Sequence, residues 1–219
     1  MDHKPYDVAV VIGRCSPYHI GHKTLTDEAL SVASHVIFFL GSAYQDRSAK
    51  NPWSFAERKA MVGDSHTEEE LERMSILPAV DTRYDAWWAQ QIRHRVQEET
   101  DRLGIAYDPA KVVLVGHSKD ASSYYLELFR EWQSTTVSNV GNINATSIRE
   151  KLAVDRHVES VREFVPPAVA VHLSDFLQKP ESVILEQCKP TSDLFNAASK
   201  KRVPVGWQDY GIEPPRHAL

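Results

Sequence analysis

Five short strand-like runs, separated by stretches of helical composition, constrain the fold of this chain more than any other feature. The runs are Val8–Ile12, Val36–Leu40, Met74–Val80, Val112–Val115 and Thr135–Val140, and the expected helices include Lys23–Ser34, Asp85–Leu103, Ser122–Trp132 and Ala145–Leu152. Continuously apolar strands are typical of a sheet covered on both faces. Alternation with helices favours parallel units with right-handed crossovers. We therefore predict an α/β fold, a Rossmann-like doubly wound parallel sheet of about five strands with a helical C-terminal part.

The turn after the first run, from Gly13 to His22, predicts a phosphate site. It joins a strand to a helix, so backbone N–H groups and the positive end of the helix dipole face a bound anion. His19 and His22 can donate to phosphate oxygens, and Gly21 between them allows a ligand to approach the backbone. The same pair could also be surface residues or metal ligands. A catalytic zinc needs about three protein ligands, and no HExxH or CxxC pattern supplies the others.

A second helix start, Asn144 to Arg149, offers another anion clamp. Asn144 or Thr146 can cap the helix. Thr146, Ser147 and the first N–H groups are donors, and Arg149 adds a planar fork of donors with permanent charge. The alternative is an ordinary capped helix with an exposed arginine. The presence of a second anion-binding motif, Gly13 to His22, disfavours this alternative. The usual phosphate motifs, G-x-x-x-x-G-K-[ST] and G-x-G-x-x-G, do not occur in the sequence.

Composition limits the classes of partner. The 219 residues carry a net charge of −5, which disfavours binding to nucleic acid or to an anionic membrane through a global basic field. The N-terminal apolar run is too short for a signal peptide or a membrane span. Cys15 and Cys188 form no metal or redox pattern, which predicts free thiols and a cytoplasmic protein. We expect residues 1–178 to form the main domain and residues 179–219 an extension or arm. The sequence leaves open whether the chain forms a homo-oligomer.

Four segments together resemble the nicotinamide-nucleotide adenylyltransferases of the HxGH nucleotidyltransferase superfamily. Residues 13–22 look like the GRFQPxHxGH signature, and residues 51–58 resemble NPFSxxER. Residues 116–126 and 143–149 are similar to the GxxKDxSSYYL and INATxIR segments of the branch often fused to a Nudix hydrolase. The resemblance covers residues 6–178. Cys15 and Ser16 stand where the family usually has Phe-Gln, and Tyr18 where it usually has Phe. The chain has no Nudix box, so we expect no Nudix domain.

The resemblance implies an enzyme that joins ATP and nicotinamide mononucleotide into NAD and pyrophosphate. Mg²⁺ is the implied cofactor, held mainly by the ATP phosphates. No general base or protein nucleophile is needed, because the attacking phosphate is already mostly dianionic at pH 7, its second pKa being about 6. Catalysis would consist of positioning and charge neutralisation. The implied catalytic residues are His19, His22 and Arg149, and the implied ATP-binding residues are Gly13, Arg14, Gly21, Lys119, Asp120, Asn144, Thr146 and Ser147.

The nicotinamide side calls for an aromatic face, because the ring is cationic. The residues that the resemblance implies for the mononucleotide are Ser16, Asn51, Arg58, Asp85, Trp87 and Trp88. Adjacent tryptophans on a helix cannot both face the same way, and the sequence leaves open which of them stacks. Alternatives are adenylyl transfer to nicotinate mononucleotide or another phosphorylated acceptor, and a non-catalytic nucleotide sensor.

Overall fold

A parallel sheet organises the molecule, as a computed structural model that describes residues 4–117, 127–138 and 143–190 shows. Within these residues, five strands pair in the order β3-β2-β1-β4-β5, and every neighbouring pair is parallel. The strands are β1 (Tyr6–Gly13), β2 (Ala33–Leu40), β3 (Met74–Pro78), β4 (Val112–His117) and β5 (Gln133–Val137). The predicted doubly wound α/β fold is therefore confirmed.

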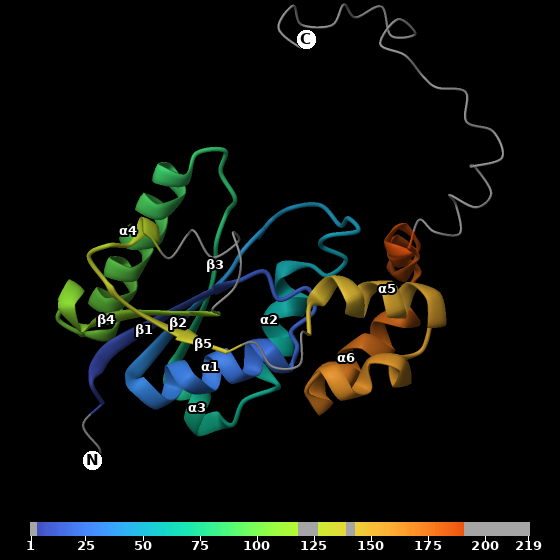
Figure 1. Cartoon of the computed structure of the whole chain (residues 1–219), viewed down its shortest axis with the longest axis horizontal. Coiled ribbons are helices and arrows are strands. Elements are labelled where there is room, and N and C mark those ends of the chain that lie inside the picture. Colours follow the sequence, from blue (N-terminus) through green and yellow to red (C-terminus); the bar gives the residue numbers. More distant parts are fainter. Residues whose placement is uncertain (1–3, 118–126, 139–142, 191–219) are drawn as a thin grey trace, which may run out of the picture. The chain divides into compact units, whose positions relative to one another are not determined.

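Helices cover both faces of the sheet (Figure 1). The α-helices are α1 (Ile20–Val32), α2 (Phe55–Gly63), α3 (Glu68–Glu72), α4 (Asp85–Leu103), α5 (Ala145–Asp155) and α6 (Pro167–Leu177). Three 3₁₀ helices lie wholly within the described part of the chain: η1 (Pro109–Lys111), η3 (Val158–Phe164) and η4 (Pro180–Cys188).

Two hydrophobic cores explain why the strands read as continuous apolar runs. Alternate residues of a strand point to opposite faces, so Ala9 and Val11 of β1 join the core with α1, α2, α5 and α6. Val8 and Val10 join the second core, which contains Ala89, Ile92 and Val96 of α4. Figure 1 shows α4 and α1 on opposite sides of the sheet.

The strand order places a topological switch point at β1. The chain runs from β1 to β2 and β3 on one side, then returns through α4 to β4 on the other side of β1. In open α/β sheets, ligands bind beyond the carboxyl ends of the strands at such a point. The turn after Gly13 lies there.

Several boundaries differ from those expected from the sequence. Helix α1 begins at Ile20 rather than Lys23, because His19 is its N-cap and the helix takes up the second histidine in its first turn. Strand β5 begins at Gln133 rather than Thr135, and β3 ends at Pro78 rather than Val80. Of the helix expected over 122–132, residues 122–126 lie outside the described residues, and residues 127–132 form 3₁₀ and turn conformations instead of an α-helix.

The C-terminal end of the described chain packs on the main body. The described residues up to Lys189 form one compact unit. Helix η4 lies against α5, and Leu185 of η4 is fully buried. The division after residue 178 stays a prediction, although η4 already belongs to this unit.

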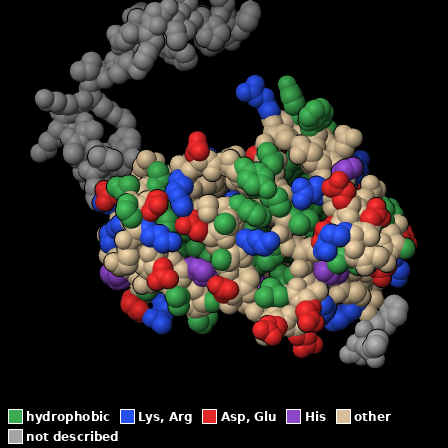
Figure 2. Space-filling view, turned by 180° about the vertical axis from the view of Figure 1, so that it is seen from behind, with side chains coloured by type: hydrophobic (Ala, Val, Ile, Leu, Met, Phe, Trp, Pro, Cys, Tyr) green, Lys and Arg blue, Asp and Glu red, His purple; other side chains and the backbone are tan. Residues whose placement is uncertain are grey.

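Both signs of charge are interspersed on the face drawn in Figure 2. Such a mixture creates no extended single-sign field, in keeping with the modest net charge. Across the described parts of the chain, every helix is either too short or too polar to cross a bilayer.

Candidate active site

The turn between β1 and α1 holds the two histidines of the first motif in a fixed arrangement. His19 is buried, and its ring stacks on that of His22 with centroids 3.7 Å apart and an angle of 29° between planes. The backbone N–H of His19 donates to Nδ1 of His22 at 3.3 Å. A neutral His22 therefore carries its proton on Nε2. A Cβ on Gly13 would lie 3.8 Å from that nitrogen, so the ring packs against the end of β1.

The second motif forms a capped helix start beside the first. Asn144 is the N-cap of α5, and its Oδ1 accepts from the Ser147 N–H at 2.9 Å and from the Ser147 hydroxyl at 3.2 Å. Asn144 is thus the capping residue of the two that the sequence left open. The cap engages the Ser147 side chain within α5, which leaves Thr146 and Arg149 to face the first motif.

Arg149 joins the two motifs. Its Nη1 donates to the Ser16 carbonyl at 2.7 Å, and its Nη2 donates to Thr146 Oγ1 at 3.2 Å. The side chain is buried, which lowers the pKa of the guanidinium. Arginine nonetheless stays protonated in proteins, so a permanent positive charge sits between the two helix starts.

A cavity of about 300 Å³ lies where the two motifs meet. It is lined by Arg14, Cys15, Ser16, His19, His22, Asn144, Ala145, Thr146 and Arg149. The buried Ser16 Oγ and Arg149 Nε have no hydrogen-bond partner among the described residues. Buried polar atoms are almost always paired, so these two atoms indicate a polar ligand.

A second cavity of about 700 Å³ adjoins the ends of β1 and β2, and Arg14 lines both cavities. It is lined by Ile12, Gly13, Arg14, Gly41, Ser42, Gln45, Lys50, Asn51, Asp81, Thr82, Asp85 and Trp88. Asn51 is 6% exposed, and its Oδ1 has no partner among the described residues. This cavity therefore also presents an unsatisfied polar atom beside an aromatic side chain.

Asp81 is a residue of this cavity that the motif analysis did not assign to a role. Its carboxylate accepts from the Ser42 N–H at 3.1 Å, from the Ser42 hydroxyl at 2.6 Å and from Gln45 Nε2 at 3.2 Å. It follows the third strand, and the rule that ligands bind beyond strand ends could have singled it out.

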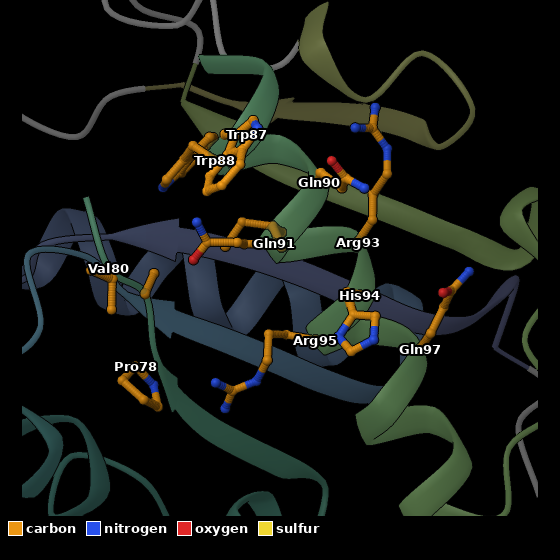
Figure 3. A pocket seen from close by; sticks show the side chains of 12 residues that line it. Pro78, Val80, Trp87, Trp88, Gln90, Gln91, Arg93, His94, Arg95 and Gln97 are labelled. Atoms are coloured by element: carbon orange, nitrogen blue, oxygen red, sulfur yellow. The ribbon is translucent and has the colours of Figure 1, made fainter. Parts of the chain in front are cut away.

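The structure separates the two adjacent tryptophans. Trp88 lines the 700 Å³ cavity and packs edge-on against Phe129, with ring centroids 6.0 Å apart. Trp87 is 68% exposed and does not line that cavity. Both line a third cavity of about 640 Å³ between α4 and the segment from Pro78 to Val80, which Figure 3 shows.

Arg58 is a buried structural residue. It is 1% exposed and donates to the carbonyls of Arg14, Gly41 and Ser42, with distances of 2.7 Å to Gly41 and 3.2 Å to Ser42. It lines neither of the two adjoining cavities. Through these bonds Arg58 holds together the ends of β1 and β2. Its expected role in binding the mononucleotide stays a prediction.

The remaining expected site residues fall into three groups. Ser16, expected on the mononucleotide side, lines the 300 Å³ cavity with the residues expected for ATP. Gly21 and Ser147 line neither of the two adjoining cavities, and the Gly21 carbonyl lies 3.0 Å from Nε2 of His117. Lys119 and Asp120 lie outside the described residues.

The described lining of the 300 Å³ cavity contains no carboxylate. Hard divalent cations prefer oxygen ligands, so this lining does not fit a resident metal ion. One group elsewhere, Asp27, His66 and Glu70, brings three ligand atoms within 4.8 Å of one another. The Lys23 ammonium already pairs with Asp27 there.

Comparisons with known proteins identify the family of this chain. A cytidylyltransferase-like family model matches residues 10–151. Over 156 residues, the chain is 33% identical to the nicotinamide/nicotinic acid mononucleotide adenylyltransferase of Acinetobacter baylyi, which covers 71% of this chain and 80% of that protein.

Two solved structures share the fold. A bifunctional NMN adenylyltransferase/ADP ribose pyrophosphatase from Francisella tularensis is 26% identical with a TM-score of 0.69, covering 89% of this chain and 56% of that one. A second structure of that protein, complexed with AMP and a manganese ion, is 24% identical with a TM-score of 0.69, over 95% and 58% of the two chains. This chain thus spans little more than half of the bifunctional protein.

Proposed function

Because the chain belongs to the cytidylyltransferase-like family, we propose that it is a nucleotidyltransferase that makes NAD and pyrophosphate from ATP and nicotinamide mononucleotide. The observation that carries the proposal is the pair of adjoining cavities that share Arg14. One is lined by histidines and a buried arginine, as a triphosphate requires. The other offers amide, carboxylate and indole groups, as a pyridine nucleotide requires.

The reaction needs little from the protein beyond placement and charge. An oxygen of the mononucleotide phosphate forms a bond to the α-phosphorus of ATP, and the bond from that phosphorus to the β-phosphate breaks, releasing pyrophosphate. The nucleophile is already an anion, so no residue has to remove a proton. The protein must bring two polyanions together and stabilise the charge of the transition state.

His22 and Arg149 supply that stabilisation in the proposed complex. The His19 N–H fixes His22 as a donor through Nε2, and a preorganised donor at the α-phosphate lowers the barrier without reorganisation. Arg149 still has undonated N–H groups after its bonds to Ser16 and Thr146, which suit the β- and γ-phosphates. Arg14 lines both cavities, and in the proposed complex it bridges the reacting phosphates.

Magnesium enters the proposal as part of the substrate, MgATP. The absence of a carboxylate from the described lining of the 300 Å³ cavity supports this assignment. Phosphate oxygens are the natural ligands of this cation, which is usually bound through substrate phosphates. In this proposal Arg14 and Arg149 neutralise the phosphate charge that Mg²⁺ leaves uncompensated.

Trp88 is the proposed stacking partner of the pyridine ring. It lines the mononucleotide cavity, and its packing on Phe129 fixes the plane of the indole. A cationic ring over an indole face gains cation–π attraction. Asp85 lines the same cavity, and its charge would favour the neutral amide of nicotinamide over the carboxylate of nicotinate.

The test is turnover by the purified full chain. ATP, nicotinamide mononucleotide and Mg²⁺ should give NAD and pyrophosphate, separated by chromatography, and nicotinate mononucleotide should be the poorer acceptor. Binding of both substrates without any dinucleotide would instead identify a nucleotide sensor. Cytoplasmic location and oligomeric state remain predictions for fractionation and light scattering.

A further inference from the structure

Tyr18 connects the first motif to a second buried histidine. Its ring is nearly parallel to that of His22, with centroids 5.8 Å apart and an angle of 13° between planes. The ring of His66 is tilted by 55° from that of Tyr18, with its centroid 6.2 Å away. Tyr18 is fully buried, and the His66 side chain has no exposed surface. Tyr18 therefore contacts both a site histidine and a histidine from the segment before α3.

The Tyr18 hydroxyl anchors this arrangement. It lies 3.1 Å from Thr26 Oγ1 and 3.1 Å from Nε2 of His66. The Thr26 hydroxyl donates to the His22 carbonyl at 2.9 Å, and Nδ1 of His66 lies 3.1 Å from a carboxylate oxygen of Glu70. A line of polar contacts thus runs from Glu70 to the backbone of His22.

The direction of each hydrogen bond follows from the number of protons available. A carboxylate only accepts, so His66 donates to Glu70 through Nδ1. Nε2 of a neutral His66 is then an acceptor and takes the Tyr18 proton. The single proton of the Thr26 hydroxyl is then shared between the Tyr18 oxygen and the His22 carbonyl. If His66 is protonated, Nε2 becomes a donor, and the Tyr18 hydroxyl must turn its proton to Thr26. The orientation of the hydroxyl beside His22 therefore depends on His66.

Charged groups on both neighbouring helices face His66. Lys23 and Asp27 approach from α1 and Glu70 from α3. Burial lowers the pKa of His66, with a further lowering by Lys23, while Glu70 and Asp27 act in the opposite direction. The net lowering keeps the ring neutral near pH 7, so the Tyr18 hydroxyl donates to His66 under those conditions.

We propose that Tyr18, His66 and Glu70 are positioning residues for His22, with the Tyr18 hydroxyl, where the family motif usually has phenylalanine, as the connecting group. This inference rests on the proposed adenylyl transfer. The network touches neither cavity, so it acts on the reaction through the plane and the backbone of His22.

Two single variants test the inference by steady-state kinetics. Tyr18→Phe keeps the ring and removes only the hydroxyl, and His66→Ala removes the group that holds it. We expect each to lower kcat about tenfold, with KM values for both substrates within about twofold of wild type. His66→Gln, whose amide can still bond the Tyr18 hydroxyl, should recover most of the loss. The double variant Tyr18→Phe/His66→Ala should be no slower than the slower single variant, because both break one chain.

A second measurement does not depend on turnover. Nitrogen NMR of histidine-labelled protein without substrate reports the protonation of each ring nitrogen, and the titration of His22 should shift in Tyr18→Phe and in His66→Ala. His172→Gln is the matched control. It removes another histidine–carboxylate pair, with Asp64 at 2.7 Å, and should leave both kcat and the His22 signal unchanged.

The outcomes separate the two proposals. An unchanged His22 titration in both variants, or losses of kcat that multiply in the double variant, would overturn the positioning role. Wild-type protein that makes no dinucleotide would instead overturn the adenylyl-transfer proposal, while the NMR titration would still decide whether the network controls His22.

Discussion

The guanidinium of Arg149 donates a 2.7 Å hydrogen bond to the carbonyl of Ser16, 133 positions earlier in the chain. The bond is buried and joins the start of α5 to the turn after β1. It places the permanent charge of the second motif against the histidines of the first. The assembly of the candidate site therefore depends on this contact.

Arg149→Lys should impair use of ATP more than use of the acceptor. Lysine keeps the charge but loses the planar fork that holds Ser16 and Thr146 together. We expect the KM for ATP to rise about tenfold and kcat to fall, measured by initial rates of NAD formation. Arg156→Lys is the matched control, because Arg156 at the end of α5 donates two hydrogen bonds to Ser182, outside the site. An unchanged KM in Arg149→Lys would contradict the assignment.

His22→Ala should lower kcat with little effect on folding. Loss of one preorganised donor to transition-state charge costs about 10²- to 10³-fold. Rates with saturating substrates measure the loss, and a thermal melt checks the fold. His94→Ala, which removes an exposed histidine of α4, should keep the wild-type rate. A His22→Ala enzyme as fast as wild type would refute the role of Nε2.

The two tryptophans should differ in their effect on the mononucleotide. Trp88→Ala removes an indole that lines the 700 Å³ cavity and should raise the KM for nicotinamide mononucleotide about tenfold. Trp87→Ala removes a side chain that is 68% exposed and should change that KM by less than about twofold. Equal effects, or the reverse order, would assign the stacking role to Trp87.

Arg58→Met should destabilise the fold. The substitution leaves the carbonyls of Arg14, Gly41 and Ser42 without their buried donor. Because unsatisfied buried groups cost about 1–3 kcal/mol each, the free energy of unfolding should fall by about 3 kcal/mol. Urea denaturation measures the change, and Lys59→Met on the exposed face of α2 is the control. Wild-type stability would show that the network is dispensable.

The lowered pKa of Glu99 predicts that the fold loses stability in acid. Hydrogen bonds from Arg102 at 2.6 and 2.9 Å lower the pKa of Glu99 from 4.5 to about 2. A carboxyl with a depressed pKa in the folded state stabilises the fold above its unfolded pKa, and this contribution is lost as pH falls through the folded value. Glu99→Gln should therefore lower the urea midpoint at pH 7, and the difference should vanish between about pH 4.5 and pH 2. A difference that persists at pH 2 would exclude an ionic origin.

The fold could be predicted because helices cover both faces of the sheet, which makes each inner strand a continuous run of apolar residues. Val8, Val10, Ala9 and Val11 are all apolar since the two faces of β1 are both buried. The grouping of His19, His22, Thr146 and Arg149 could be anticipated because each motif opens a helix after a strand. Their chemical roles stay predictions for the experiments above.

Other features were beyond the sequence because they depend on packing. The sequence does not distinguish an arginine that binds a ligand from one that donates to backbone carbonyls, so the buried bonds of Arg58 could not be foreseen. The contact between Asp81 and Ser42 joins segments 39 positions apart. The loop after β2 and the end of β3 meet only when the strands pair side by side.

By itself, the sequence determined the parallel α/β architecture and the two helix starts, because hydrophobic patterning and turn chemistry are local properties. Only the tertiary structure decided that Trp88 rather than Trp87 lines the 700 Å³ cavity, that Arg58 is buried, and that the Tyr18 hydroxyl meets Thr26 and His66. These outcomes depend on the rotation of helices and the register of strands, which are fixed by packing between distant segments.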